Sequence, residues 1–595
     1  MENFMGNAKA PLEALRLAMK DAQIDAYFIP RGDAFSGEEV QAADERLAWI
    51  SGFTGSAGLA IVTMDTAILF SDGRYTLQMK NQTTGDWQCM VMPSDKPSDW
   101  IISHLDGKTL GFDPMLMTMS EHRQLIRALS EKDINVKPVA DNLIDQIWQD
   151  RPTPQISIPW DVDPLHHGQD RTDKINAVVA NMTDAGADIL MICDPTELAW
   201  LLNIRAADLT NTPVMLAFAM LSRDKEIMIF HDDLEGLDID QRHIHIRPRQ
   251  QMIDDLRSID GKVIWLDPAQ TPLALANAIE AREAADTKIM SRTSPLKQMK
   301  AIKNSVEQDG FRSAHCRDAV AVIRFLAWLD THVMDQTLTE IEAGEKLQSF
   351  RKQVSGYLSD SFPSISGSGA HGAIVHYRAT EASNAPLRPD SLYLIDSGGQ
   401  YHDATTDITR TVAIGQPGKD EIFCYTHVLK AHIALDQQIF PKGTTGIQLD
   451  AITRQSMWNA GLDYAHGTGH GVGCALGVHE GPASISPRGS VSICEGMVLS
   501  NEPGYYRDGS FGIRLENLII VVAKANDMLG FEHVTWVPFD RRLIDVSLLS
   551  EAEREWLNHY HQNVKDKIMP ALTAHDYGDG DGDTVAWLTA QTAPL

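Results

Sequence analysis

The 595-residue chain has few cysteines and no long apolar run. Its six cysteines are scattered and lack the Cys-x-x-Cys spacing of zinc or redox sites, so they indicate reduced thiols and not a disulfide framework. No run of about 18 or more apolar residues occurs, and the N-terminal stretch lacks the apolar core of a secretion signal. We therefore expect a cytoplasmic protein that does not enter a membrane.

Positive charge is also scarce. Lys and Arg number 52 against 81 Asp and Glu, which gives a net charge of −29. Phosphate backbones and anionic membrane surfaces would repel such a chain, so neither nucleic acid nor membrane is expected as a partner. The HExxH signature of single-zinc proteases and the GxSxG signature of serine hydrolases are both missing.

The length and composition predict a multidomain globular protein, because 595 residues exceed one ordinary core. Strand-like segments alternate with helical ones in the first half, which indicates α/β architecture. Four prolines between positions 151 and 164 indicate a linker. The sequence after this linker repeats the order of the first part (helix, buried strand, acidic helix), so we infer a duplicated unit of about 150 residues. The predicted domains are 1–155, 156–302 and 303–595.

Five side chains in the last third of the chain are of types that bind metal ions. They are Asp396, Asp407, His470, Glu502 and Glu516. Each lies in or beside a short apolar segment with strand character. Four carboxylates and one imidazole carry too much negative charge for one site unless cations neutralise it, and two divalent ions sharing bridging carboxylates would do so. A donor set rich in oxygen and free of thiolate favours Mn²⁺.

The spacing of these residues supports a shared site. Asp396 ends one apolar run and Asp407 begins the next. Two strands joined by a glycine-containing turn would therefore place both carboxylates at the same end of the strand pair. Arg514 and Glu516 are two positions apart in GIRLEN, so on a continuous strand they would share a face while Leu515 points away. An arginine beside a bridging glutamate could orient it.

Two other motifs do not support the functions that they suggest. The GxGxxG match at 367–372 precedes the strand-like segment AIVHY and not a helix, which argues against a dinucleotide site. A glycine-rich turn that orients His376 is the favoured interpretation. The spaced aspartates from Asp579 resemble a calcium loop, but Thr584 and Ala590 stand where glycine and glutamate are required. We expect a flexible acidic tail there, after a last helix over 550–571.

Several sequence blocks together resemble one enzyme family. The blocks are HGTGHGVG around His466 and His470, GAIVHY around His376, VHEGP around His479, SGFTGSAG at 51–58, SDGRY at 71–75, KNSVE at 303–307 and PFDRRLID at 538–545. They resemble the metallopeptidases of the pita-bread fold, which include methionine aminopeptidase, prolidase and aminopeptidase P. The resemblance covers nearly the whole chain and is strongest to the three-domain, cytosolic type of aminopeptidase P.

The resemblance implies two related N-terminal α/β domains followed by a pita-bread catalytic domain, an α/β (α+β) protein overall. It implies release of the N-terminal residue from peptides with proline in second position. By that pattern Asp396 binds one metal ion, His470 and Glu502 bind the other, and Asp407 and Glu516 bridge both. A bridging water or hydroxide would attack the scissile carbonyl, with Glu502 as proton acceptor. A homodimer is also implied.

The remaining site residues follow from the same resemblance. His376, His466 and His479 would bind substrate and stabilise the intermediate, because an imidazole with a pKa near neutrality can donate to a developing oxyanion. His470, Arg514 and, from the N-terminal domain, Arg74 would also contact the peptide. Two alternatives remain open: prolidase or another pita-bread peptidase, and a non-catalytic peptide-binding module. Loss of metal ligands would mark the module, and here all five are present.

Overall fold

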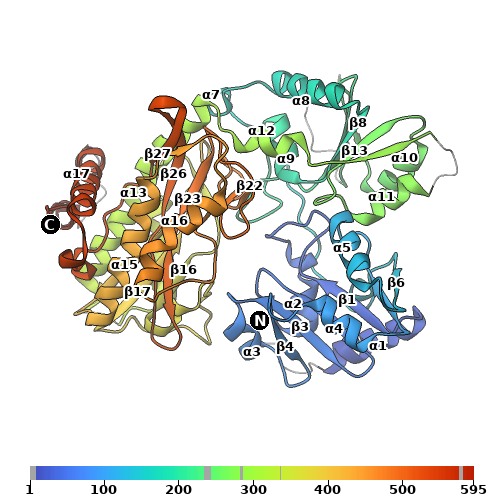
Figure 1. Cartoon of the computed structure of the whole chain (residues 1–595), viewed down its shortest axis with the longest axis horizontal. Helices are drawn as coiled ribbons and strands as arrows, with labels where there is room; N and C mark the ends of the chain where they lie inside the picture. The colour runs from blue at the N-terminus through green and yellow to red at the C-terminus, as the bar shows by residue number, and fades with distance from the viewer. Residues whose placement is uncertain (1–8, 233–242, 282–285, 335–336, 575–580) are drawn as a thin grey trace. The chain divides into compact units, whose positions relative to one another are not determined.

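The computed structural model describes residues 9–232, 243–281, 286–334, 337–574 and 581–595 (Figure 1). The chain forms two compact units. The first unit comprises Met1–Asp161, Asp170–Leu209 and Val214–Lys297, and the second comprises Val162–Gln169, Thr210–Pro213 and Gln298–Leu595. Within the described ranges, no helix has the length and apolar character needed to cross a membrane.

The first unit contains two six-stranded sheets, with strand orders β4-β3-β2-β1-β5-β6 and β12-β11-β10-β8-β13-β14. The elements of the first sheet region are α1 Lys9–Asp21, β1 Ala26–Pro30, α2 Arg46–Ser51, β2 Leu59–Thr63, β3 Ala67–Asp72, α3 Thr76–Gln82, β4 Gln88–Met92, α4 Pro97–His104, β5 Thr109–Phe112, α5 Met119–Leu129, β6 Asn135–Pro138 and α6 Leu143–Ile147. Those of the second are α8 Arg171–Ala185, β8 Ile189–Ile192, α9 Pro195–Leu202, β10 Phe218–Ser222, β11 Ile227–Phe230, β12 Ile244–Arg247, α10 Met252–Ser258, β13 Val263–Leu266, α11 Leu273–Glu280 and β14 Lys288–Ser291. A short strand pair, β7 Trp160–Asp161 with β9 Ile204–Arg205, also belongs to this unit.

The two sheets share strand directions as well as order. In the first, β1 is parallel to β5 and antiparallel to β2, and in the second, β8 is parallel to β13 and antiparallel to β10. The central strands are buried along their length, as expected where helices cover a mixed sheet. The same architecture is therefore built twice from different residues.

The second unit contains three small sheets and one larger sheet, and it holds the five predicted metal ligands. Its elements are α7 Pro164–His167, α12 Pro295–Ala301 (whose first residues belong to the first unit), α13 Ser305–His332, α14 Glu340–Arg351, β15 Tyr357–Asp360, β16 Ile365–Ser368, β17 Ser391–Ser397, β18 Gly399–Tyr401, β19 Ile408–Ile414, α15 Lys419–Asp436, β20 Phe440–Pro441, α16 Gly446–Asn459, β21 Gly469–Gly471, β22 Glu480–Ile485, β23 Val498–Asn501, β24 Gly504–Arg507, β25 Phe511–Arg514, β26 Asn517–Lys524, β27 Met528–His533, α17 Glu551–Ala574 and α18 Asp581–Gln591. The sheet orders are β16-β17-β19, β20-β27-β26-β23-β21-β22, β15-β18 and β24-β25.

Long helices pack against these sheets and form the largest apolar core of the unit. Residues of α13, α15 and α17 share this core with residues of β17, β19 and β25. Figure 1 shows α13, α15 and α16 running alongside the strands. The start of α13 is fixed by a capping box, in which the side chain of Asn304 accepts from the backbone of Glu307 and the Glu307 carboxylate accepts from the backbone of Asn304.

Three sequence expectations about local structure were wrong. Leu515 and Glu516 do not continue a strand from Arg514, because β25 ends at Arg514 and β26 begins only at Asn517. The predicted strand-like segment AIVHY does not form a strand: its start ends the 3-10 helix Gly369–Ala373, and a bend and a turn at His376 follow. A side chain at Gly367 would collide with the backbone of Gly372, and Gly369 has a φ of +54°, so the chain turns tightly just before this segment.

The expected flexible acidic tail is the third error. Residues Asp581–Gln591 form the helix α18, and Leu588 is fully buried in the core that α13 and α17 share. The indole nitrogen of Trp587 donates to Asp330 at 3.2 Å. The start of the aspartate run, at Asp579, lies outside the described residues. Acidic composition alone did not reveal the apolar face of this helix.

Because Leu588 is buried, Leu588→Ala should lower the free energy of unfolding of the catalytic unit by about 2–5 kcal/mol, the range for truncating a packed leucine. The neighbouring Thr589→Ala variant changes an exposed side chain of the same helix and should shift stability little. Thermal and denaturant unfolding of both variants would measure the difference. Equal stability of the two variants would contradict packing of α18 on the core.

Candidate metal centre

His470 lies on the short strand β21, with its ring oriented by the backbone. Its Nδ1 is 2.9 Å from the carbonyl oxygen of Gly471, and its backbone N–H donates to Ser500 Oγ at 2.9 Å. A carbonyl only accepts, so Nδ1 carries a proton, and Nε2 is the ring nitrogen left to bind a metal ion. Nε2 lies 3.5 Å from Asp407 Oδ2 and 3.4 Å from Glu502 Oε1. The nitrogen that can bind a metal therefore faces two carboxylates.

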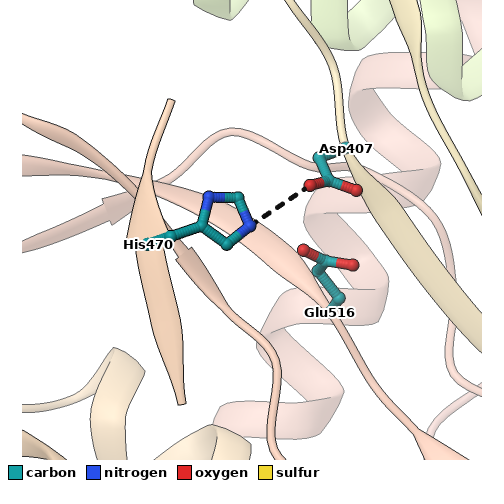
Figure 2. A group of neighbouring side chains, drawn as sticks. All are labelled: Asp407, His470 and Glu516. Carbon is teal, nitrogen blue, oxygen red and sulfur yellow. Dashed lines mark ion pairs between the residues drawn. The ribbon is translucent and has the colours of Figure 1, made fainter. Parts of the chain in front are cut away.

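Asp407, His470 and Glu516 converge from three separate segments. Each offers one ligand atom, and these atoms lie within 4.8 Å of one another. Figure 2 shows the imidazole and the two carboxylates pointing toward a common point, with the ion pair between His470 and Asp407 dashed. Asp407 and Glu516 are buried, while His470 is half-buried. A metal ion at that point would be within reach of all three.

Asp396 joins the same cluster through strand pairing. It lies on β17 opposite Thr409 of β19, two positions after Asp407. Thr409 Oγ1 donates to Glu516 Oε2 at 2.7 Å and accepts from Arg514 Nε at 3.1 Å. Arg514 Nη2 in turn donates to Asp396 Oδ2 at 2.5 Å. One threonine hydroxyl thus links the guanidinium to the buried glutamate.

Arg514 was expected to orient Glu516 from the neighbouring position on one strand face, but the contact between them is indirect. The guanidinium contacts Asp396 directly and reaches Glu516 through Thr409. Two carboxylates are therefore held by one hydrogen-bonded group. The strand break at Glu516 allows this arrangement, since its side chain need not alternate with that of Arg514.

The electrostatics of the cluster disfavour four negative charges. Burial, then the charges of Asp407, Glu502 and Asp396, raise the pKa of Glu516 well above its ordinary value. Burial also raises the pKa of Glu502, although His470 and Arg514 act in the opposite direction. The pKa of Asp396 is raised by burial and by Asp407, against the opposing charge of Arg514. A bound proton or cation is therefore favoured over four bare negative charges.

The residues present fit a metal centre. Asp396 Oδ1 is a buried oxygen with no hydrogen-bond partner among the described residues, and such an atom is costly unless a cation or proton compensates it. The donor set of four carboxylates and a neutral imidazole contains only oxygen and nitrogen, which suits hard or borderline divalent ions. Carboxylates with raised pKa values would give up their protons to such ions.

Of the predicted substrate residues, two histidines lie against the cluster. His479 is exposed and packs its ring edge-on against that of His470, with centroids 4.2 Å apart. His466 Nε2 lies 2.8 Å from the hydroxyl of Tyr506, which accepts from Arg514 Nη1 at 2.7 Å. His376 is half-buried, in the turn that follows the 3-10 helix. Arg74 lies in the first unit, where it donates to Asp72 at 2.8 Å.

Sequence reasoning missed three polar residues that support the site. They are Thr409, which bridges Arg514 and Glu516; Tyr506, which bridges Arg514 and His466; and Ser500, which accepts from His470 and donates to Glu502 Oε1 at 3.1 Å. Thr409 lies two positions after Asp407, and Ser500 and Tyr506 lie on either side of Glu502. Their places beside predicted metal ligands were the one signal in the sequence.

Family models match nearly the whole chain. The model "Metallopeptidase family M24" matches residues 309–523, and the "C-terminal region of peptidase_M24" matches 527–595. Two models described as "Creatinase/Prolidase N-terminal domain" match residues 11–147 and 150–307. A probable Xaa-Pro aminopeptidase P of Laccaria bicolor is 39% identical over 99% of this chain and 94% of its own length. The chain belongs to metallopeptidase family M24.

Further relatives agree over the same extent. Aminopeptidase P2 of Arabidopsis thaliana is 38% identical over 96% of this chain and 86% of its own length. Among solved structures, the X-prolyl aminopeptidase of Caenorhabditis elegans, described as a cytosolic enzyme with a di-nuclear active site, matches with a TM-score of 0.93 and 32% identity, covering 99% of this chain and all of that one. These matches confirm the predicted family, the fold class and the aminopeptidase class. The exact domain boundaries and the roles of single residues stay predictions.

Thr409→Val should lower kcat about 10–100-fold, the usual effect of losing a group that orients a metal ligand. Valine keeps the shape of threonine but cannot bond Glu516 or Arg514. The matched control is Thr426→Val, another fully buried threonine, whose hydroxyl donates to a carbonyl within α15. Steady-state kinetics and metal content would be measured for both. A Thr409 variant as active as the Thr426 variant would contradict the bridging role.

Proposed function

We propose that two divalent metal ions bind at this cluster and that the enzyme hydrolyses the bond between an N-terminal residue and a following proline. Asp396 would bind one ion, His470 and Glu502 the other, and Asp407 and Glu516 would bridge them. The observation that carries this proposal is the convergence of Asp407, His470 and Glu516 within 4.8 Å. When bound, the two ions would activate water and polarise the scissile carbonyl.

Glu502 is the proposed proton acceptor for the attacking water. Its carboxylate lies 3.4 Å from His470 and accepts from Ser500, so it is held at the edge of the cluster. Burial raises its pKa, and a carboxylate with a raised pKa takes up a proton more readily. Glu502 would then pass that proton to the leaving nitrogen of proline. This transfer matters because the amide nitrogen must gain a proton before it can leave as an amine.

Histidines would stabilise the tetrahedral intermediate and hold the peptide. His479 adjoins His470 and is exposed, so its ring can donate to the developing oxyanion. We assign His376 and His466 to the same group on the strength of the family pattern. The nearby carboxylates would also attract the free α-amine of the substrate, which favours cleavage at the N-terminus.

The substrates we propose are peptides with proline in second position. Arg74 and Arg514 would contact the peptide, with His470 beside it. We further propose Mn²⁺ as the native metal, since the donors are hard and include no thiolate. A homodimer located in the cytoplasm is the state that we infer from the family pattern and from the Caenorhabditis elegans relative, which is described as cytosolic.

Removal of metal should abolish activity. After exhaustive chelation we expect no measurable turnover, and Mn²⁺ should restore more activity than Co²⁺ or Zn²⁺. Elemental analysis of the restored enzyme should give two ions per chain. The control is a chelated sample returned to Mn²⁺ before assay, which separates metal loss from irreversible damage. Full activity in the metal-free enzyme would refute the mechanism.

Peptide length should distinguish an aminopeptidase P from a prolidase. A prolidase must recognise the carboxylate directly behind the proline, whereas an aminopeptidase P must let the chain continue. We expect kcat/KM to be much higher for Xaa-Pro-Yaa tripeptides than for Xaa-Pro dipeptides, with little turnover when alanine replaces proline. Arg74→Ala should impair longer peptides more than dipeptides. A measured preference for dipeptides would assign the enzyme to the prolidases instead.

A further inference from the structure

Glu480 carries a buried carboxylate held by two buried lysines. Exposed fractions are 5% for Glu480, 5% for Lys300 and 3% for Lys303. Lys300 Nζ donates to Glu480 Oε2 at 2.8 Å, and Lys303 Nζ contacts Oε1 of the same carboxylate. Lys300 lies in the last turn of α12, and Lys303 lies just before α13. All three residues belong to the catalytic unit.

Stability alone does not account for these three charges. Taking two ammonium groups and a carboxylate out of water costs several kcal/mol per ion, and well-packed apolar side chains of similar volume would often be as stable. What an ion cluster supplies and an apolar contact does not is a fixed direction for the groups that it joins. The segment that Glu480 anchors is therefore informative.

Glu480 directly follows His479 in the sequence. The residue paired with Glu480 across the sheet, Gly471, directly follows His470. In the pairing of β21 with β22, Gly471 lies opposite Glu480, with an irregular register between His470 and Gly471. The two histidine rings then meet edge-on with centroids 4.2 Å apart. Because the ring of His479 is exposed, the backbone at Glu480 decides where it can reach. Fixing Glu480 thus fixes His479 against the metal ligand.

The loop between the two histidines has a second anchor. The carbonyl oxygen of Leu476 accepts from Gln400 Nε2 at 2.7 Å and from Thr405 Oγ1 at 3.0 Å, and both donors are fully buried. Within the loop, the backbone N–H of Gly473 donates to the carbonyl of Gly477 at 3.0 Å. The loop is therefore held in its middle by Gln400 and Thr405 and at its end by the lysines.

We propose that the cluster of Glu480, Lys300 and Lys303 is a positioning device for His479, and through it a determinant of how the enzyme binds Xaa-Pro peptides. The inference rests on the proposed contact of His479 with substrate. The hydrogen bonds of the Glu480 carboxylate go to the two lysines, and Glu480 acts through its neighbour His479. The lysines connect this position to the segment that enters the catalytic unit before α13.

A double-mutant cycle tests whether Glu480 acts through His479. The Mn²⁺-loaded enzyme and its Glu480→Gln, His479→Ala and doubly substituted variants are assayed on one Xaa-Pro-Yaa tripeptide. Glu480→Gln should lower kcat/KM about 10–100-fold, the range for losing a group that orients a functional side chain. In the His479→Ala background the same change should have almost no effect, because residues that act as a unit are not additive. Bound metal should stay at two ions per chain.

Two further variants guard against misfolding. Glu480→Gln removes the negative charge that both buried lysines contact, whereas Lys303→Met keeps the ion pair of Lys300 with Glu480 and should fold. Lys303→Met should lower kcat/KM as much as Glu480→Gln does and should show the same dependence on His479. Glu480→Asp keeps the negative charge, so its kcat/KM should lie between those of the wild type and Glu480→Gln. Lys174→Met is the matched control: Lys174 is buried to 1% exposure in the first unit and donates to Trp200 and Asn203. It should lower the melting temperature without altering kcat/KM.

Three results would overturn the inference. Equal factors for Glu480→Gln with and without His479 would show that the cluster is merely structural. An unchanged kcat/KM in His479→Ala would remove the residue through which the cluster acts. Loss of bound metal in Lys303→Met would show an effect on the metal centre instead. By contrast, a wild-type enzyme inactive on the tripeptide would refute the proposed function itself.

Discussion

Repulsion among four carboxylates that share a poorly solvated site is the constraint on which the catalytic unit depends. Burial and three neighbouring acids raise the pKa of Glu516 well above its ordinary value, and Asp396 and Glu502 are shifted in the same direction. One guanidinium, that of Arg514, lies against the group and donates to Asp396. One positive charge cannot balance four negative ones, so the cluster favours the uptake of protons or metal ions.

The fold meets this constraint by placing the acids where strands begin, end or break. Asp407 precedes β19, Glu502 lies between β23 and β24, and Glu516 lies between β25 and β26. Side chains at such positions are released from strict alternation and can converge from several directions. Arg410 fixes the backbone at this strand break. It is fully buried and donates to the carbonyl of Glu516 at 2.6 Å and to Asn517 Oδ1 at 2.8 Å.

The candidate ligands could be found in the sequence because their chemistry is visible in their identity and their apolar flanks. Thr409 and Tyr506 could not, since each is an ordinary polar residue whose role comes from pairing with distant segments; Thr409 reaches Glu516 across 107 positions. The strand prediction through Leu515 failed because alternation was assumed to be unbroken. The helix α18 was missed because its stability comes from burial of Leu588 in a core assembled from distant residues, and not from local composition.

One chain of hydrogen bonds joins the carboxylate cluster to His466. The carbonyl of Gly467 lies 2.7 Å from His466 Nδ1, so that nitrogen carries the proton and Nε2 accepts from Tyr506. Burial raises the pKa of Tyr506 to about 12, which keeps its hydroxyl neutral and able to donate while it accepts from Arg514. The chain thus runs from Arg514 through Tyr506 to His466. Because Arg514 also donates to Asp396, two intervening side chains, those of Tyr506 and Arg514, connect His466 to a carboxylate of the cluster.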